Sequence, residues 1–165
     1  MSFEHPVDNH PAPIAYELIC LPELAHLAEA RIGWLLRVDE QIKAGRQILG
    51  MCYLPSVQGS LRPLFDWFMA KEFGDDPPLD FLIVLDRSYW REATDRQREI
   101  LVYHELMHCG HAVDKHGVER FDKETGQPVY CIRGHDVEEF TAVVERYGIH
   151  NQDIAAFVRA AQEHV

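Results

Sequence analysis

The sequence predicts an α+β domain in which a short mixed or antiparallel sheet packs against an active-site helix and further helices. Three observations support this fold class. Residues 80–86 form an apolar run between turn residues, which is typical of a buried strand. Residues 95–108 follow a helix-capping pattern. The chain has 165 residues, a length that suits one domain with a core of its own.

The first thirteen residues are predicted to form a flexible N-terminal arm, and residues 14–165 a single domain. The arm is polar and contains three prolines. It lacks the basic start and the apolar stretch of a secretory signal peptide. No apolar run in the chain approaches the ~20 residues that a membrane span needs. We therefore expect a cytoplasmic protein without a membrane span.

Residues 22–44 are predicted to form the first helix of this domain. Apolar residues recur there at spacings of three and four, and Pro22 is compatible with a first helical turn. Gly45 would end the helix. A strand over residues 47–54 and a short helix over residues 61–73 are expected next. The short helix has four apolar side chains on one face: Leu64, Phe65, Phe68 and Met69.

The buried strand 80–86 is expected at the edge of the sheet, and the helix near residues 95–108 follows it in the chain. Thr94 and Gln97 have the spacing of a capping box, in which both side chains satisfy backbone N–H groups at a helix start. The helix boundary is therefore predicted at Asp95.

The last third of the chain predicts a hairpin and two helices. Residues 123–126 form a hairpin-like turn between two short extended pieces within residues 121–132. Asp136 is expected to cap a helix that Gly148 ends. Residues 151–163 are predicted to form a final amphipathic helix.

The net charge and the cysteine pattern argue against certain partners and certain kinds of metal site. The formal net charge is −11, from 27 acidic and 16 basic residues. A surface this acidic repels phosphate backbones and anionic membranes, so nucleic-acid partners are disfavoured. Four cysteines occur, and none forms a C-x-x-C pair. They are expected to be reduced thiols, with Cys109 and Cys131 in the core.

The strongest chemical signal is the H-E-x-x-H spacing of residues 104–108. On a helix, His104 and His108 lie one turn apart on the same face, so their imidazoles can share one metal ion. Glu105 lies beside them and can reach a water on the metal without being a ligand. Zinc lowers the pKa of such a water towards ~7, and the carboxylate accepts its proton as it attacks a carbonyl. The pattern predicts a zinc ion on the two histidines, with Glu105 as general base.

A catalytic zinc takes three protein ligands and keeps one open position. His135 is the predicted third ligand, because Gly134 permits a sharp turn and the histidine then opens the next helix. Asp136 would be an outer acceptor that orients a ligand imidazole.

Three carboxylates remain as alternative third ligands. Glu138 and Glu139 lie on the same predicted helix as His135. Asp114 stands where a longer H-E-x-x-H-x-x-G-x-x-H/D motif has its third ligand, although this chain has His111 at the position of that glycine.

These residues resemble the putative phage metallopeptidase family, a small zincin domain found in phage and prophage sequences. The resemblance covers residues 81–148 and rests on the segments DFLIVLD (80–86), YHELMHCGH (103–111), FDKETGQPVY (121–130) and GHDVEEFTAVVERYG (134–148). The chain is more distantly similar to SprT-like metalloproteases, whose third ligand is a histidine shortly before an apolar helix. It departs from them by having Asp136 after that histidine and by lacking a zinc ribbon or basic tail, which does not support a DNA-linked role.

The resemblance implies a zincin-like fold, a zinc cofactor, and His104, His108 and His135 as its ligands, with Glu105 as the base. The leading hypothesis is a zinc-dependent metallopeptidase that cleaves a protein or peptide, held in extended form along an edge strand near residues 80–88. One alternative is a zinc hydrolase acting on a non-peptide amide. The other is a non-catalytic metal-binding module, against which Glu105 argues, because a purely structural site needs no base.

Overall fold

The computed structural model describes residues 1–74, 78–137, 140–150 and 152–163. The chain divides into two compact units, Met1–Arg133 and Gly134–Val165, which are described separately. No helix in the described part of the chain combines the length and the apolar character needed to cross a membrane.

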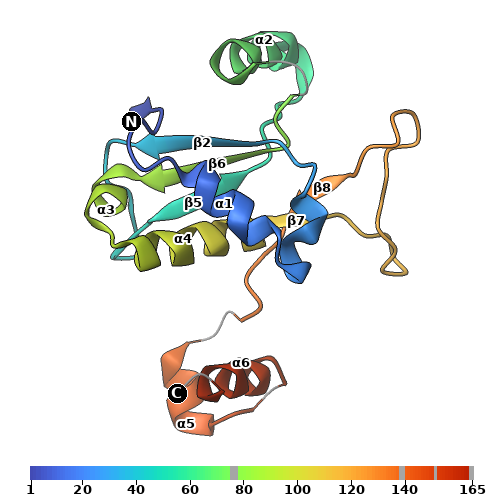
Figure 1. Ribbon diagram of the computed structural model, residues 1–165. Coiled ribbons are helices and arrows are strands. Elements are labelled where there is room, and N and C mark those ends of the chain that lie inside the picture. Colours follow the sequence, from blue (N-terminus) through green and yellow to red (C-terminus); the bar gives the residue numbers. More distant parts are fainter. Residues whose placement is uncertain (75–77, 138–139, 151, 164–165) are drawn as a thin grey trace. The chain divides into compact units, whose positions relative to one another are not determined.

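The first unit is built on a four-stranded mixed sheet with the strand order β1-β2-β6-β5 (Figure 1). The two central strands, β2 (Ile32–Arg37) and β6 (Phe81–Asp86), are parallel. The outer strands, β1 (Phe3–Glu4) and β5 (Gly50–Tyr53), are each antiparallel to their neighbour. The predicted α+β class with a short mixed sheet is therefore confirmed.

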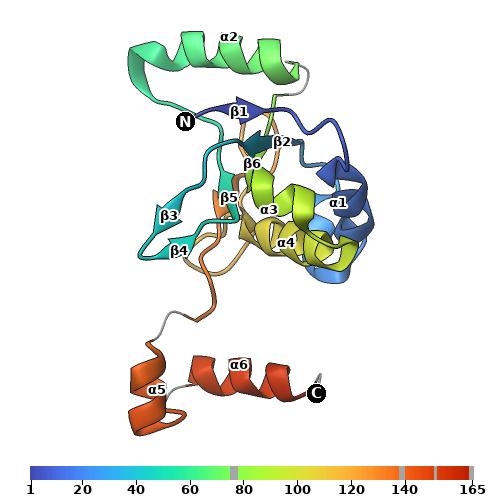
Figure 2. The same ribbon diagram turned by 90° about the vertical axis from the view of Figure 1, so that its left-hand side faces the viewer.

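Helices cover one face of this sheet. Figures 1 and 2 show α1 (Pro11–Ile19), α3 (Arg87–Glu92) and α4 (Asp95–His108) on the same side. The core between sheet and helices consists of side chains that are less than a tenth exposed. They include Trp34, Leu36, Phe81, Ile83 and Leu85 from the strands, Leu24 and Leu27 from the 3-10 helix η1 (Pro22–Leu27), and Leu101, Val102 and Leu106 from α4.

The prediction of a helix over residues 22–44 is wrong. After η1 the chain forms β2, and the spacing of three and four that suggested a helix is accidental. Residues Ile32–Arg37 pair in register with Phe81–Asp86, and four of these six β2 residues are buried. A central parallel strand is apolar on both faces, so its sequence lacks the alternation that would identify it.

The predicted N-terminal arm contains two ordered elements. Phe3 and Glu4 pair with Arg37 and Leu36, and α1 begins at Pro11.

The structure also corrects the position of the edge strand. β6 lies between β2 and β5, so the strand near residues 80–88 cannot receive an added peptide strand. One edge is β5, which pairs with β6 from Gly50 opposite Leu85 to Tyr53 opposite Leu82. The predicted strand over residues 47–54 is thus confirmed in its second half. Its first residue, Gln47, belongs to a separate small hairpin of β3 (Ile42–Lys43) and β4 (Arg46–Gln47).

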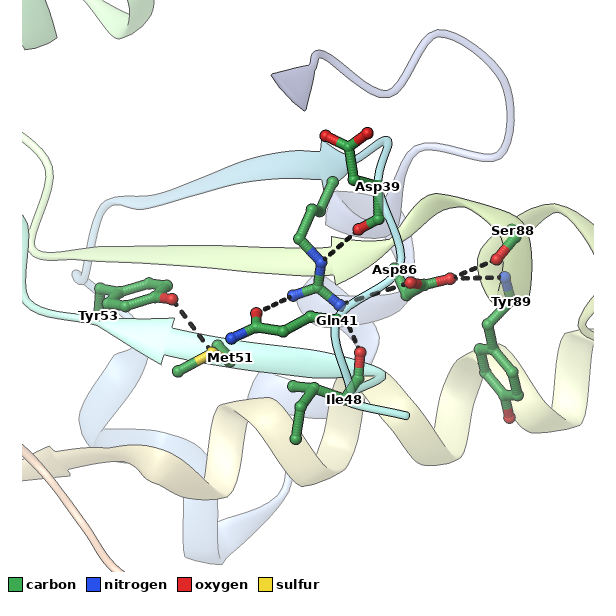
Figure 3. Close-up of polar contacts among 9 residues, drawn as sticks. Asp39, Gln41, Ile48, Met51, Tyr53, Asp86, Ser88 and Tyr89 are labelled. Atoms are coloured by element: carbon green, nitrogen blue, oxygen red, sulfur yellow. Dashed lines mark hydrogen bonds and ion pairs between the residues drawn. The ribbon is translucent and has the colours of Figure 1, made fainter. Parts of the chain in front are cut away.

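A buried ion pair fixes the segment that leads into β5 (Figure 3). Arg37 and Asp86 are 2% and 1% exposed, and their charged groups lie 3.4 Å apart. The guanidinium of Arg37 also donates to the carbonyls of Asp39 and Ile48 and to the side chain of Gln41. These bonds hold residues 39–48 against the end of the sheet, directly before Gly50.

α2 (Arg62–Phe73) confirms the helix predicted over residues 61–73. None of its residues is buried, although Phe73 at its end reaches the sheet beside Gly33. His5 forms an ion pair of 3.2 Å with Glu72, which fixes the same end of the helix.

The helix α4 has the predicted boundaries. The Thr94 hydroxyl accepts from the Gln97 N–H at 3.3 Å, and the Gln97 side chain accepts from the Thr94 N–H at 2.8 Å. The helix ends at His108, and the chain continues at once into β7 (Cys109–His111). β7 pairs with β8 (Tyr130–Ile132), so the hairpin predicted over residues 121–132 supplies a strand that holds the end of α4.

The second unit contains α5 (Thr141–Tyr147) and α6 (Gln152–Gln162). Gly148 ends α5 with φ of 70°, as predicted. The prediction that Asp136 caps this helix is wrong, because the residue at the cap position is Phe140 and no side-chain cap bond forms. The predicted start of the last helix, at Asn151, lies outside the described residues.

Candidate metal centre

His104 and His108 occupy one face of α4, as their spacing predicts. Their ring centroids lie 5.0 Å apart with an interplanar angle of 79°. His104 is exposed and His108 is half-buried, so a metal ion can reach both imidazoles from solvent. Two nitrogen donors at this separation suit one ion between them.

The orientation of His108 is set by the strand that returns beside it. The carbonyl of Arg133 lies 2.7 Å from Nδ1 of His108, and the Arg133 N–H donates to the His108 carbonyl at 2.8 Å. A carbonyl can only accept, so Nδ1 carries the proton in this hydrogen bond. In the neutral imidazole, the lone pair that can bind a metal is then on Nε2.

His135 follows this fixed point by two residues. The side-chain ligand atoms of His104, His108 and His135 all lie within 4.8 Å of one another. The expectation that Gly134 is needed for a sharp turn before this histidine is wrong. Gly134 does not have a positive φ, and nothing lies within 4 Å of where its Cβ would be, so glycine is not required there. The hydrogen bonds between Arg133 and His108 bring the chain to this place.

The other candidate ligands have different positions. Glu138 and Glu139 lie outside the described residues. Asp114 is in the arm between β7 and β8, where its Oδ1 accepts the N–H groups of His116 and Val118 at 2.7 and 3.0 Å. This carboxylate therefore stabilises a turn. Asp136 is exposed.

Glu105 lies between His104 and His108 in the sequence of α4 and is 2% exposed. Its Oε2 is buried and has no hydrogen-bond partner among the residues that the structure describes. Burial raises the pKa of Glu105 from 4.5 to about 7. A buried carboxyl without a partner costs free energy, so a functional partner such as a water or substrate group is the expected explanation.

Gly50, which the sequence analysis did not single out, makes this position possible. A Cβ at Gly50 would lie 2.6 Å from Cδ and 2.9 Å from Cγ of Glu105, and would also overlap Oε1. The edge strand β5 thus packs its bare backbone against the carboxylate. Glycine within a predicted strand is a known sign of such close approach, and this signal was present in residues 47–54.

The residues present fit a divalent metal ion. Three imidazoles leave one position of a tetrahedral ion open, and a buried glutamate directly follows the first of them in α4. Two thiols, that of Cys52 in β5 and that of Cys109 directly after His108, contact each other at 3.4 Å. The hydrogen bond to Cys52 and burial raise the pKa of Cys109.

A cavity of about 670 Å³ lies beside the end of α4. Its walls come from η1, from the last turn of α4, and from the β7–β8 ribbon with its arm. The residues that define it include Glu23, Met107, His111, Glu119, Phe121 and Arg133. This volume is in the range of sites that bind small molecules or several side chains of a peptide.

Comparison with known proteins gives one family. A family model described as "Putative phage metallopeptidase" matches residues 5–162, which is nearly the whole chain. No curated protein and no solved structure matches.

Proposed function

Because this chain belongs to the putative phage metallopeptidase family, we propose that it is a zinc-dependent peptidase of the zincin type. Its ligands are His104, His108 and His135, and its general base is Glu105. The observation that carries this proposal is the buried Oε2 of Glu105, in the same H-E-x-x-H segment of α4 that supplies His104 and His108. A structural metal site would leave such a carboxyl without a purpose.

Zinc, when bound, would supply Lewis acidity and lower the pKa of a coordinated water towards ~7. Glu105 would accept the proton of the attacking water and pass it to the leaving amine. In the metal-free protein burial raises the pKa of Glu105 to about 7, and a bound cation would favour its carboxylate form, which is the form that accepts a proton. The apolar surroundings of Glu105 exclude competing waters from the carboxylate.

The substrate would be a protein or peptide in extended form. We place it along β5 instead of β6, because β5 is at the end of the sheet order. Backbone hydrogen bonds to an edge strand hold a peptide without regard to its side chains. Gly50 at the start of β5 touches Glu105, so a peptide on this strand passes close to the base. We expect the protein to act in the cytoplasm.

The test is metal analysis combined with hydrolysis assays on purified protein. We expect one zinc per chain in the wild type and in Glu105→Gln. Zinc binding should be strongly weakened in three variants: His104→Ala, His108→Ala and His135→Ala. Glu105→Gln should lose hydrolysis, since an amide cannot take the proton. Stoichiometric zinc in the His104→Ala/His108→Ala double variant after dialysis would contradict the site.

The same assay separates the alternative functions. Casein as substrate reports a peptidase, and a panel of small non-peptide amides reports the other hydrolase class. Hydrolysis by Glu105→Gln at near the wild-type rate would exclude Glu105 as the base.

A further inference from the structure

Two thiols from distant parts of the chain meet beside the candidate metal centre. Cys52 belongs to the edge strand β5, and Cys109 directly follows the last residue of α4. Their Sγ atoms are 3.4 Å apart, although 57 positions separate the two residues in the sequence. Both are free cysteines in this structure. The other two, Cys20 and Cys131, lie elsewhere, Cys20 exposed after α1 and Cys131 against Gly110.

The two sulfurs differ in access. Cys109 is 1% exposed, whereas Cys52, which packs against the core, keeps part of its surface exposed. An oxidant would therefore meet Cys52 first and would find the second thiol already in contact with it. This combination of one accessible thiol and one resolving thiol is what reversible oxidation requires.

We propose that Cys52 and Cys109 form an oxidative modification site, at which a peroxide converts the two thiols into a disulfide that links β5 to the end of α4. In the first step the Cys52 sulfur attacks one oxygen of hydrogen peroxide, giving a sulfenic acid and one water. In the second step the Cys109 sulfur attacks the Cys52 sulfur, and the sulfenic oxygen leaves as a second water. The pair loses two electrons and two protons, and the peroxide is reduced.

The disulfide would disturb the catalytic geometry, a consequence that rests on the proposed function. A disulfide needs a sulfur–sulfur distance of about 2.05 Å, so the two sulfurs must approach by about 1.3 Å. Gly50 lies two residues before Cys52 on the same strand, and its backbone already packs closely against Glu105. A strand drawn towards α4 has no room at this point, so Glu105 must move. Misplacement of a catalytic group by about 1 Å can cost on the order of 100-fold in rate.

The first arm of the test follows the thiols alone and needs no substrate. The full-length Cys20→Ser/Cys131→Ser variant, which retains only the pair, is treated with hydrogen peroxide under non-denaturing conditions. We expect both thiols to disappear together in a monomer, and peptide mapping to show the link between Cys52 and Cys109. Adding Cys52→Ala should leave one thiol, which forms no intramolecular link. Peroxide treatment that leaves both thiols free, or that stops at a sulfenic or sulfinic acid on Cys52, would overturn the site.

The second arm compares the hydrolysis rate of each variant before and after peroxide. The variant with the pair should lose tenfold or more of its rate and recover it with dithiothreitol. The Cys52→Ala variant should keep its own starting rate. A disulfide that forms without loss of rate would overturn the inhibitory effect. Absence of hydrolysis in the reduced wild type would instead count against the proposed peptidase, while the thiol measurements would still decide the disulfide.

Discussion

Glu105 keeps its position because the neighbouring strand presents no side chain to it. Gly50 is 55 positions away in the sequence, and its Cα faces the carboxylate from the edge of the sheet. The roles of His104, Glu105 and His108 follow from spacing on one helix, so the sequence alone predicts them. The contact with Gly50 depends on how β5 pairs with β6, which no local pattern reveals.

Gly50→Ala should therefore impair the base while leaving the metal ligands intact. The new methyl group would overlap Cδ and Cγ of Glu105, so the whole side chain must rotate away. We expect zinc to stay bound, hydrolysis to fall at least tenfold, and stability to fall by about 1–3 kcal/mol. Metal analysis, casein hydrolysis and urea unfolding measure the three effects. Gly134→Ala is the matched control, because nothing lies within 4 Å of its Cβ position and its φ is not positive. Full activity in Gly50→Ala would show that the contact is unimportant.

The raised pKa of Glu105 predicts a pH-dependent stability in protein from which metal has been removed with a chelator. The folded state holds the proton up to about pH 7, whereas the unfolded chain releases it near 4.5. The stability from this group is therefore complete below pH 4.5 and is lost as pH rises through 7. Glu105→Gln has no ionisable group at this position and carries no such loss. Its free energy of unfolding should therefore exceed that of the wild type by about 3 kcal/mol at pH 8 and by much less at pH 5. Urea unfolding at both pH values measures this difference. An equal difference in unfolding free energy between variant and wild type at the two pH values would contradict burial of an ionisable Glu105.

At the scale of elements, local signals predicted α4 and failed for β2. The capping box at Thr94 and Gln97 is a contact between near neighbours, so it can be read from the sequence. β2 is defined by pairing with β6, some fifty positions further along the chain, and its apolar run fits a helix equally well. β7 was missed for the same reason, since β8 is its partner. Elements that depend on distant partners are those the sequence did not predict.

The ion pair of Arg37 and Asp86 is an element-scale constraint that can be tested. Burial raises the pKa of Asp86, but hydrogen bonds from the Tyr89 N–H and the Ser88 hydroxyl and the charge of Arg37 outweigh it, so the pKa is lowered. Asp86→Asn leaves Arg37 buried without its counter-charge, and we expect a loss of about 3–5 kcal/mol at pH 7.

The pH dependence of this loss has a definite sign. A lowered pKa contributes stability above the pKa of the unfolded chain, and this stability is lost as pH falls through the folded value. The difference in unfolding free energy between wild type and Asp86→Asn should therefore shrink on acidification below the ordinary pKa of an aspartate. Ser88→Ala, which removes one hydrogen bond and keeps both charges, should cost only about 1 kcal/mol. A constant difference across the acidic range would show that the charge of Asp86 does not contribute.

At the scale of the whole molecule, the proposed third ligand, His135, follows the last residue of the first compact unit by two positions in the sequence. The first unit ends at Arg133, and the large core cluster with the hydrophobics packed against it lies between Ala12 and Tyr130. His135 is the second residue of the second unit, whereas the family match extends through both units. That residues 14–165 act as one domain thus remains our proposal. The metal site needs only the first residues after position 133.

Shortened chains can identify the third ligand without a point substitution. A chain of residues 1–137 keeps His135 and lacks Glu138 and Glu139, while a chain of residues 1–133 lacks all three. Both retain the core cluster, and thermal unfolding checks that they fold. We expect residues 1–137 to bind zinc as tightly as the full chain. Residues 1–133 should bind it at least ~10–100-fold more weakly, since loss of a ligand costs no less than loss of an outer partner. Equal weakening in both shortened chains would place the ligand at or beyond position 138. Undiminished binding by residues 1–133 would place it in the first unit, where Asp114 is the candidate.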